Sequence, residues 1–111
     1  MRYSIFILYQ ATPAWLSLSR ERRNAIFTAE LAPIIFDYQV NVRIRLFDSE
    51  AFHARVSDVM MISCEDVQQY YFFMEALRDT SFFSVPYIDL KDVIVSVEDG
   101  FRAYEAKSDQ P

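Results

Sequence analysis

Glycine is nearly absent from the chain. Gly100 is the one glycine among 111 residues, where an average usage of roughly 7% would give about eight. A loop that cradles phosphate needs two or three glycines, because its backbone must approach the phosphate closely. The sequence therefore excludes the glycine-rich nucleotide-binding loops.

Cysteine and histidine are equally scarce, and Cys64 and His53 are the single residues of these types. One cysteine cannot form a disulfide within the chain, and there is no cluster of cysteine and histidine to hold a structural zinc ion. We therefore expect a reducing, cytoplasmic location, no bound metal and no cofactor.

Long apolar runs and basic segments are also missing. The apolar run after Arg2 ends at Gln10, which is too short for the core of a signal peptide, and no stretch of about 18 apolar residues follows. The formal net charge is −5, and no segment is dense in lysine or arginine, so little charge is available to neutralise phosphates. Neither a membrane nor a nucleic acid is an expected partner.

The composition is that of a globular domain, with 52% hydrophobic residues, and the length suits one domain. We assign residues 1–106 to this domain and residues 107–111 to a frayed polar tail. Composition and alternation of apolar residues predict strands over 3–9, 40–47, 56–63 and 87–93. Trp15 and Leu16, 48–55 and 80–86 are predicted connections.

Apolar spacing predicts three helices. The first follows Ser19, a residue type that caps helices well, and Pro33 predicts a kink or break inside it. The second spans 65–79, with Val67, Tyr70, Tyr71, Met74 and Leu77 as its buried stripe. Residues 97–104 predict a closing helix, but the valines of 93–97 also alternate as in a strand, so the boundary within 90–98 stays open.

The predicted order of elements is that of the ferredoxin-like fold. We expect an α+β βαββαβ domain with a four-stranded antiparallel sheet, helices on one face and a C-terminal helix. In the first strand Tyr3, Ile5, Ile7 and Tyr9 share one face, and Phe6 and Leu8 share the other. The sheet face without helices is thus apolar too, and we predict a homodimer in which a second copy covers this open face.

Six segments resemble the darcynin family of short bacterial proteins, whose function is not established. They are YSIFILY at 3–9, TPAWL at 12–16, ELAPI at 30–34, RLFD at 45–48, YYFFME at 70–75 and residues 94–104 around EDGF. The resemblance covers nearly the whole chain. It implies a relative of the ferredoxin-like, dimeric α/β-barrel proteins, a group that includes cofactor-free monooxygenases, haem-degrading enzymes and plain binding modules. It implies no catalytic residue.

His53, in the second connection, is the candidate catalytic residue, because it is the one side chain expected to act as a general acid or base at neutral pH. A solvated surface histidine is the simpler interpretation. Cys64 is interpreted as a small buried residue rather than a reactive thiol, since its neighbours Glu65 and Asp66 oppose thiolate formation.

Five residues are candidates for ligand binding. Arg43 and Arg45 share the polar face of the second strand, and we expect Asp58 to oppose them from the third. If this face lines the interior between two protomers, the arginines could bind an acidic small molecule. Ion pairs with Asp58 or with the partner are the simpler alternative. Tyr9 and Trp15 are candidates to line a pocket for a flat apolar ligand.

Three functions remain open. The first is a structural or small-ligand-binding module. The second is a cofactor-independent monooxygenase that acts on a small aromatic compound near Tyr9, Trp15, Arg45 and His53. The third is a regulatory protein interaction module that uses the aromatic helix at 70–73, where two of the four rings must point away from the helix's own core stripe.

Overall fold

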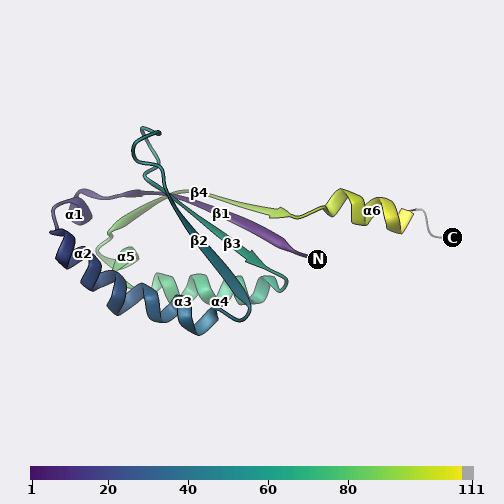
Figure 1. Ribbon diagram of the computed structural model, residues 1–111, viewed down its shortest axis with the longest axis horizontal. Helices are drawn as coiled ribbons and strands as arrows, with labels where there is room; N and C mark the ends of the chain where they lie inside the picture. Colours follow the sequence, from purple (N-terminus) through teal and green to yellow (C-terminus); the bar gives the residue numbers. More distant parts are fainter. Residues whose placement is uncertain (109–111) are drawn as a thin grey trace.

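A computed structural model describes residues 1–108 of the chain. Figure 1 shows a twisted sheet with helices along one of its faces. The sheet is antiparallel, with the strand order β2-β3-β1-β4. Its strands are β1 (Tyr3–Ala11), β2 (Val42–Asp48), β3 (Asp58–Cys64) and β4 (Ile88–Val97).

Six α-helices and one π-helical segment accompany the described strands. They are α1 (Pro13–Leu16), α2 (Arg20–Ile26), η1 (Phe27–Leu31), α3 (Ala32–Tyr38), α4 (Val67–Arg78), α5 (Ser81–Ser84) and α6 (Gly100–Ser108). The ferredoxin-like fold with a C-terminal helix is therefore confirmed. No helix among residues 1–108 is long and apolar enough to cross a membrane.

The first long helix has the interruption that Pro33 predicts. Ser19 caps its start by accepting a hydrogen bond from the Arg22 N–H at 3.1 Å. The chain then widens into η1, where the Ala32 N–H bonds to the Phe27 carbonyl, five residues back. A proline inside a regular α-helix clashes with the carbonyl four residues earlier, and the wide turn just before Pro33 accommodates its ring.

Two predicted connections contain short helices instead. Trp15 lies in α1, and the segment after α4 forms α5. A helix of four residues has almost no periodicity to detect, and each of these depends on its neighbours in the fold.

The last strand is longer than its predicted range. β4 continues to Val97 because Val95 and Val97 pair with Ile5 and Tyr3 of β1, which gives their backbone groups partners. The closing helix starts at Gly100 rather than Val97, after Asp99 in a left-handed conformation at φ 53°. α6 includes Lys107 and Ser108, which the sequence assigned to the tail, while 109–111 lie outside the described residues.

β4 also contains a bulge. Leu8 pairs with Asp92, but the next residue, Tyr9, pairs with Leu90, so Lys91 has no partner in β1. An extra residue in one strand shifts the alternation of its side chains by one position, so that the apolar residues before and after the bulge point to the same face of the sheet. Ile88 and Leu90 therefore stay on the same face as Val93, toward the helices.

The core lies between the sheet and the helices. Its fully buried side chains are Ile5, Val42, Ile62 and Phe73. In α4 the buried residues are Phe73, Met74 and Leu77, while Val67 and Tyr71 are exposed. The predicted stripe was therefore wrong at Val67 and Tyr71, because helical spacing alone did not decide which of two adjoining apolar stripes faces the sheet.

The opposite sheet face has no helix on it (Figure 1). It carries Phe6 and Leu8 of β1, Val59 and Met61 of β3, Phe47 of β2 and Ile94 of β4. The segment between β2 and β3 rises on this side, and α6 extends beyond the sheet with no buried residue (Figure 1). Within residues 1–108, the open face thus carries the predicted apolar residues across its middle, with charged residues on its edge strands.

Candidate functional site

A cavity of about 210 Å³ lies between the helix-covered face of the sheet and the segments α1, η1 and α5. It is lined by Tyr9, Ala11, Trp15, Phe27, Leu31, Leu46, Asp48, Asp58, Phe82 and Ile88. We call it the sheet–helix cavity. It brings together three of the predicted ligand-binding residues, Tyr9, Trp15 and Asp58, and its walls are otherwise mainly apolar.

Trp15 is held in this wall by the hydrogen bonds of α1. Thr12 caps the helix by accepting from the Trp15 N–H at 3.4 Å, and its own hydroxyl donates to the Pro86 carbonyl at 2.8 Å. Arg23 of α2 donates to the carbonyls of Trp15 and Leu16 at 3.1 and 2.8 Å. The indole position thus depends on contacts with segments on both sides of it.

Aromatic rings pack around the indole. The Trp15 centroid lies 5.4 Å from the ring of Phe82 in α5 and 5.4 Å from that of Tyr87. Glu30 of η1 contacts the start of α5, where its carboxylate accepts hydrogen bonds from the N–H and the hydroxyl of Ser81. Two walls of the cavity are therefore joined by polar contacts as well as by packing.

The rim of the cavity is acidic. Asp48 ends β2 and Asp58 begins β3 as its register partner. Together with Glu50 they place carboxylate oxygens within 4.8 Å of one another, the one group of its kind among residues 1–108 that could hold a metal ion. Neither of the two ion pairs in this part of the chain includes them. The negative charge at the rim is therefore not balanced by a nearby basic side chain.

The environment of Asp58 disfavours its charged form. Burial raises the pKa of this carboxyl most, the Ser57 hydroxyl opposes the rise, and Asp48 and Glu50 add to it. Burial, with the charges of Asp58 and Asp48, also raises the pKa of Tyr9. Tyr9 thus presents a neutral phenol to the cavity at physiological pH, and a cation beside it would offset the charge of the rim.

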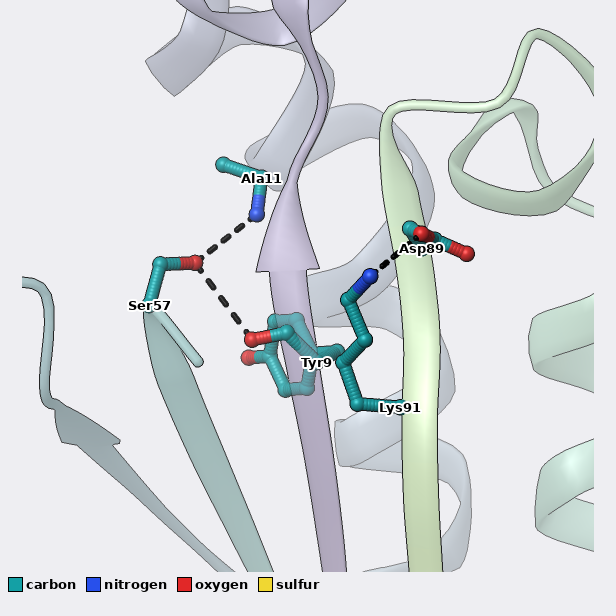
Figure 2. Close-up of polar contacts among 5 residues, drawn as sticks. All are labelled: Tyr9, Ala11, Ser57, Asp89 and Lys91. Atoms are coloured by element: carbon teal, nitrogen blue, oxygen red, sulfur yellow. Dashed lines mark hydrogen bonds and ion pairs between the residues drawn. The ribbon is translucent and has the colours of Figure 1, made fainter. Parts of the chain in front are cut away.

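Ser57 fixes the strands beside these groups. Figure 2 shows its hydroxyl between β1 residues, accepting from the Ala11 N–H at 2.8 Å and lying 3.4 Å from the Tyr9 carbonyl. Ser57 is itself buried, and its N–H donates to the same Tyr9 carbonyl at 3.0 Å. On the other edge of the same view, Lys91 pairs with Asp89 at 2.9 Å.

Arg43 and Arg45 do not reach this site. Both extend from the open face of β2, where Arg45 lies over the ring of Phe47 at 5.2 Å from its centroid. Asp58 lies on the helix-covered face. The expectation that Asp58 opposes the arginines was therefore wrong, because the register pairs Asp58 with Asp48 and places Ser63 and Met61 beside Arg43 and Arg45.

His53 lies in the exposed segment between β2 and β3 and lines neither the sheet–helix cavity nor a larger hollow at the far end of these strands. Its Nδ1 accepts hydrogen bonds from the N–H groups of Arg55 and Val56 at 3.1 and 3.0 Å. The ring therefore stabilises its own loop. The four residues of the predicted monooxygenase site, Tyr9, Trp15, Arg45 and His53, do not converge on one space.

The larger hollow, of about 560 Å³, includes Arg2, Arg43 and Glu65 in its lining. Arg2 and Glu65 form an exposed ion pair across it at 3.6 Å. Cys64 also lines it, but the residue is buried, and burial with the charge of Asp66 raises the pKa of its thiol. Most side chains that line this hollow are charged or polar, and Val40 is the one aliphatic residue among them.

Two of the four rings of the aromatic helix point outward, as expected, but Tyr71 takes the outward place that the predicted stripe left to Phe73. Phe73 is buried and Tyr70 is half-buried, while Tyr71 and Phe72 are exposed with their ring centroids 6.2 Å apart. These two rings lie on the outer side of α4, away from the sheet–helix cavity.

Sequence reasoning missed Asp48, Glu50 and Leu46 as parts of a site. The alternation of β2 places Asp48 on the same face as Leu46, and this signal was present. No signal in the sequence indicated the pairing of Asp48 with Asp58, because this pairing depends on the register of two strands joined by a nine-residue connection.

Comparison with known proteins places the chain in a family. The family model described as Darcynin, domain of unknown function, matches residues 2–109. Darcynin of Chromobacterium violaceum is 47% identical over 77 residues, which cover 69% of this chain and 96% of that protein. Darcynin 1 of Acinetobacter baumannii is 37% identical over 91 residues, covering 82% of this chain and 100% of its own.

Solved structures share the fold at low sequence identity. A haem-binding protein from Thermus thermophilus superposes with a TM-score of 0.77 at 17% identity, covering 94% of this chain and 44% of its own. A chlorite dismutase from Candidatus Nitrospira defluvii gives 0.75 at 13% identity, covering 87% and 40%. The chain thus spans less than half the length of these structures. The match of the family model over nearly every residue, with the identity to curated relatives, shows that the chain belongs to the darcynin family.

Proposed function

We propose that this protein binds a small organic cation, an apolar ring that carries a basic nitrogen, in the sheet–helix cavity. The observation that carries the proposal is the position of Asp48 and Asp58, two carboxylates without a basic partner, at the rim of a cavity walled by Tyr9, Trp15 and Phe82. The expected acidic ligand depended on Arg43 and Arg45, which face away from this space.

Two kinds of contact would hold such a ligand. An ammonium group forms charge-assisted hydrogen bonds with carboxylates, and the faces of tryptophan and tyrosine attract cations. The apolar ring would lie against Leu31 and Leu46, which line the same cavity. A bound positive charge would also favour the ionised form of Asp58, whose pKa is raised in its absence.

Haem does not fit the residues present. A haem iron needs an axial ligand such as histidine, cysteine, methionine or tyrosinate. His53, the single histidine, uses Nδ1 within its loop and lines neither the cavity nor the larger hollow. Tyr9 lines the sheet–helix cavity and Cys64 lines the larger hollow, but the raised pKa of each side chain opposes the deprotonated form that would bind iron. No methionine lines either space within residues 1–108. The proposed function therefore involves no haem, although solved structures of similar fold include a haem-binding protein.

The second part of the proposal is a homodimer formed through the open face of the sheet. Phe47 and Ile94 on this face are 40% and 47% exposed, and Phe6, Leu8, Val59 and Met61 add to the same surface. A contiguous apolar surface of this kind is stabilised by a second copy that removes it from water.

The ligand proposal is tested with three one-ring probes of matched shape: 2-phenylethylamine, 2-phenylethanol and 3-phenylpropanoate. Binding is followed by the shifts of backbone amide signals in NMR titrations. Loss of one charge-assisted hydrogen bond costs about 1.5–3 kcal/mol, so we expect the amine to bind at least about tenfold more tightly than the alcohol. The amide signals of Tyr9, Trp15 and Leu46 should move.

Asp58→Asn should remove this preference, while Asp37→Asn on the exposed surface of α3, which makes the same change in net charge, should preserve it. Equal binding of amine and alcohol would remove the cation from the proposal. No shift at the cavity with any of the three probes would refute the binding function.

A further inference from the structure

The charged side chains of the open face are separated onto its two edges. Arg43 and Arg45 extend from β2, one edge strand, on the face that carries Met61 and Phe6. Asp89 and Asp92 extend from β4, the other edge strand, on the same face, because they pair with Gln10 and Leu8. One edge of this face is therefore basic and the other acidic.

These charges cannot neutralise one another within one chain. Three strand spacings separate β2 from β4, a distance of about 14 Å. Asp89 pairs with Lys91, but Arg43, Arg45 and Asp92 take part in neither of the ion pairs formed within residues 1–108. Both edges keep an unpaired charge that a partner surface could match.

The middle of the open face is uncharged. Across the sheet, one row of register partners runs Arg45, Met61, Phe6 and Ile94, and the next row runs Phe47, Val59, Leu8 and Asp92. These two rows therefore form an apolar stripe between a basic border and an acidic border, and the adjoining row is polar but uncharged at Ser63 and Ser4. A surface of this kind is complementary to its own copy after a half-turn.

We infer that a second copy of this chain docks on the open face about a two-fold axis that runs along the strands, so that Arg45 pairs with Asp92 of the partner subunit. This axis reverses the strand order of the partner and places β2 of one copy over β4 of the other. Symmetry then forms the ion pair twice, once on each side of the apolar stripe. This inference rests on the proposed homodimer. It specifies how the two subunits are oriented at the open face.

The alternative symmetric arrangement is unfavourable. A two-fold axis across the strands would place β2 over β2, and would bring Arg43 and Arg45 against their own copies at the interface. Like charges at a protein interface suppress an arrangement, whereas complementary charges select one. The axis along the strands avoids the repulsion and uses both borders.

The geometry of packed sheets permits this pairing. Stacked sheets lie about 10 Å apart, and same-face neighbours along a strand are about 7 Å apart. Arg45 and Asp92 belong to adjacent rows, so the long arginine side chain needs to reach across one row only. Aligned sheets also cross at about 30°, which displaces the edge strands relative to one another by about half of this row spacing.

Charge reversal tests the arrangement. The variants are Arg45→Glu, Asp92→Arg and the double variant, and the dimer dissociation constant is measured by analytical ultracentrifugation at low salt. We expect each single reversal to raise the dissociation constant at least about tenfold, because it places like charges together twice per dimer. The double variant should return to within about threefold of the unmodified chain, since the pair is restored with opposite sign.

Two exposed residues on the helix side provide matched controls. Arg22→Glu on α2 and Asp37→Lys on α3 change the net charge equally and should leave the dissociation constant unchanged. Circular dichroism confirms that each variant is folded.

The possible results distinguish a failure of the homodimer from a failure of the pairing between Arg45 and Asp92. A monomeric unmodified chain refutes the homodimer and the inference together. A dimer that the single reversals do not weaken leaves the homodimer standing and overturns the pairing. A double variant as weak as the single variants also overturns it, because both reversals would then act on other contacts.

Discussion

The hydroxyl group of Ser57 donates a hydrogen bond to Oδ2 of Asp58 at 2.6 Å. The hydroxyl oxygen of Ser57 also accepts a hydrogen bond from the Ala11 N–H at 2.8 Å. One buried side chain thus joins the end of β1 to the start of β3 and orients the acidic rim of the sheet–helix cavity.

Ser57→Ala should lower the free energy of unfolding by about 1–3 kcal/mol, because it leaves the Ala11 N–H without its partner. Urea unfolding measures the change. Ser84→Ala, at an exposed position in α5, is the control and should cost less than about 0.5 kcal/mol. Equal losses in the two variants would show that the Ser57 hydroxyl has no special contribution.

The raised pKa of Asp58 predicts how stability depends on pH. The folded chain holds the proton of Asp58 more tightly than the unfolded chain, in which the carboxyl titrates near its ordinary value of 3.8. Stability from this group is therefore highest below that pH, falls as the pH rises through the raised folded value, and is constant above it.

Asp58→Asn removes this dependence. We expect the variant to gain stability relative to the unmodified chain at neutral pH, and the gain to disappear on acidification below pH 3.8. Urea unfolding of both proteins at several pH values measures the difference. A gain that grows as the solution becomes more acidic would contradict the expected sign.

The contact between Glu30 and Ser81 predicts a local effect on the cavity wall. Glu30→Ala should lower stability by about 1.5–3 kcal/mol, because two hydrogen bonds to a carboxylate are lost. Amide hydrogen exchange should become faster at Ser81 and Phe82 first. Glu75→Ala, an exposed position on α4, serves as the control, and uniform acceleration across α4 and α5 would argue against a local role.

Gly100 predicts a coupled pair of substitutions. A Cβ atom at this position would lie 3.0 Å from Cγ1 of Val97, so Gly100→Ala must displace that side chain. In the unmodified chain the clash opposes the gain in helix propensity, which is at most about 1 kcal/mol. A Val97→Ala background removes Cγ1 and leaves the contact with Cβ at 3.3 Å. In this background we expect the same substitution to be more favourable than in the unmodified chain, with a coupling of at least about 0.5 kcal/mol in a double-mutant cycle. Strict additivity would dismiss the contact.

Local pattern was sufficient for much of the fold. The alternation in β1 correctly separated Ile5 and Ile7 from Phe6 and Leu8, and the structure adds that the first pair lies in the core and the second on the open face. Pro33 correctly predicted an interrupted helix, because its ring restricts the backbone whatever surrounds it. These features depend on residues close together in the sequence.

The site depended on features that are not local. The face of Asp58 follows from the register of β3 against β2, and the register follows from packing of the whole sheet. The cavity needs α1 and α5, two helices of four residues each, which are held by contacts with segments far away in the sequence, the Pro86 carbonyl for the cap of α1 and Glu30 for α5. Sequence reasoning therefore identified Tyr9 and Trp15 as a pair but not the acidic rim beside them.

The bulge at Lys91 makes the length of one strand adjustable at a single place. Deletion of Lys91 would leave Leu90 next to Asp92 and restore plain alternation, with every side chain of β4 still on its present face. Deletion of a single residue at position 93 or 94 would instead shift the alternation of the strand on one side of the deletion. Residues of the core and of the open face would then exchange places there. A change in the length of β4 thus preserves both the cavity and the dimer surface only at the bulge, where Lys91 has no partner in β1.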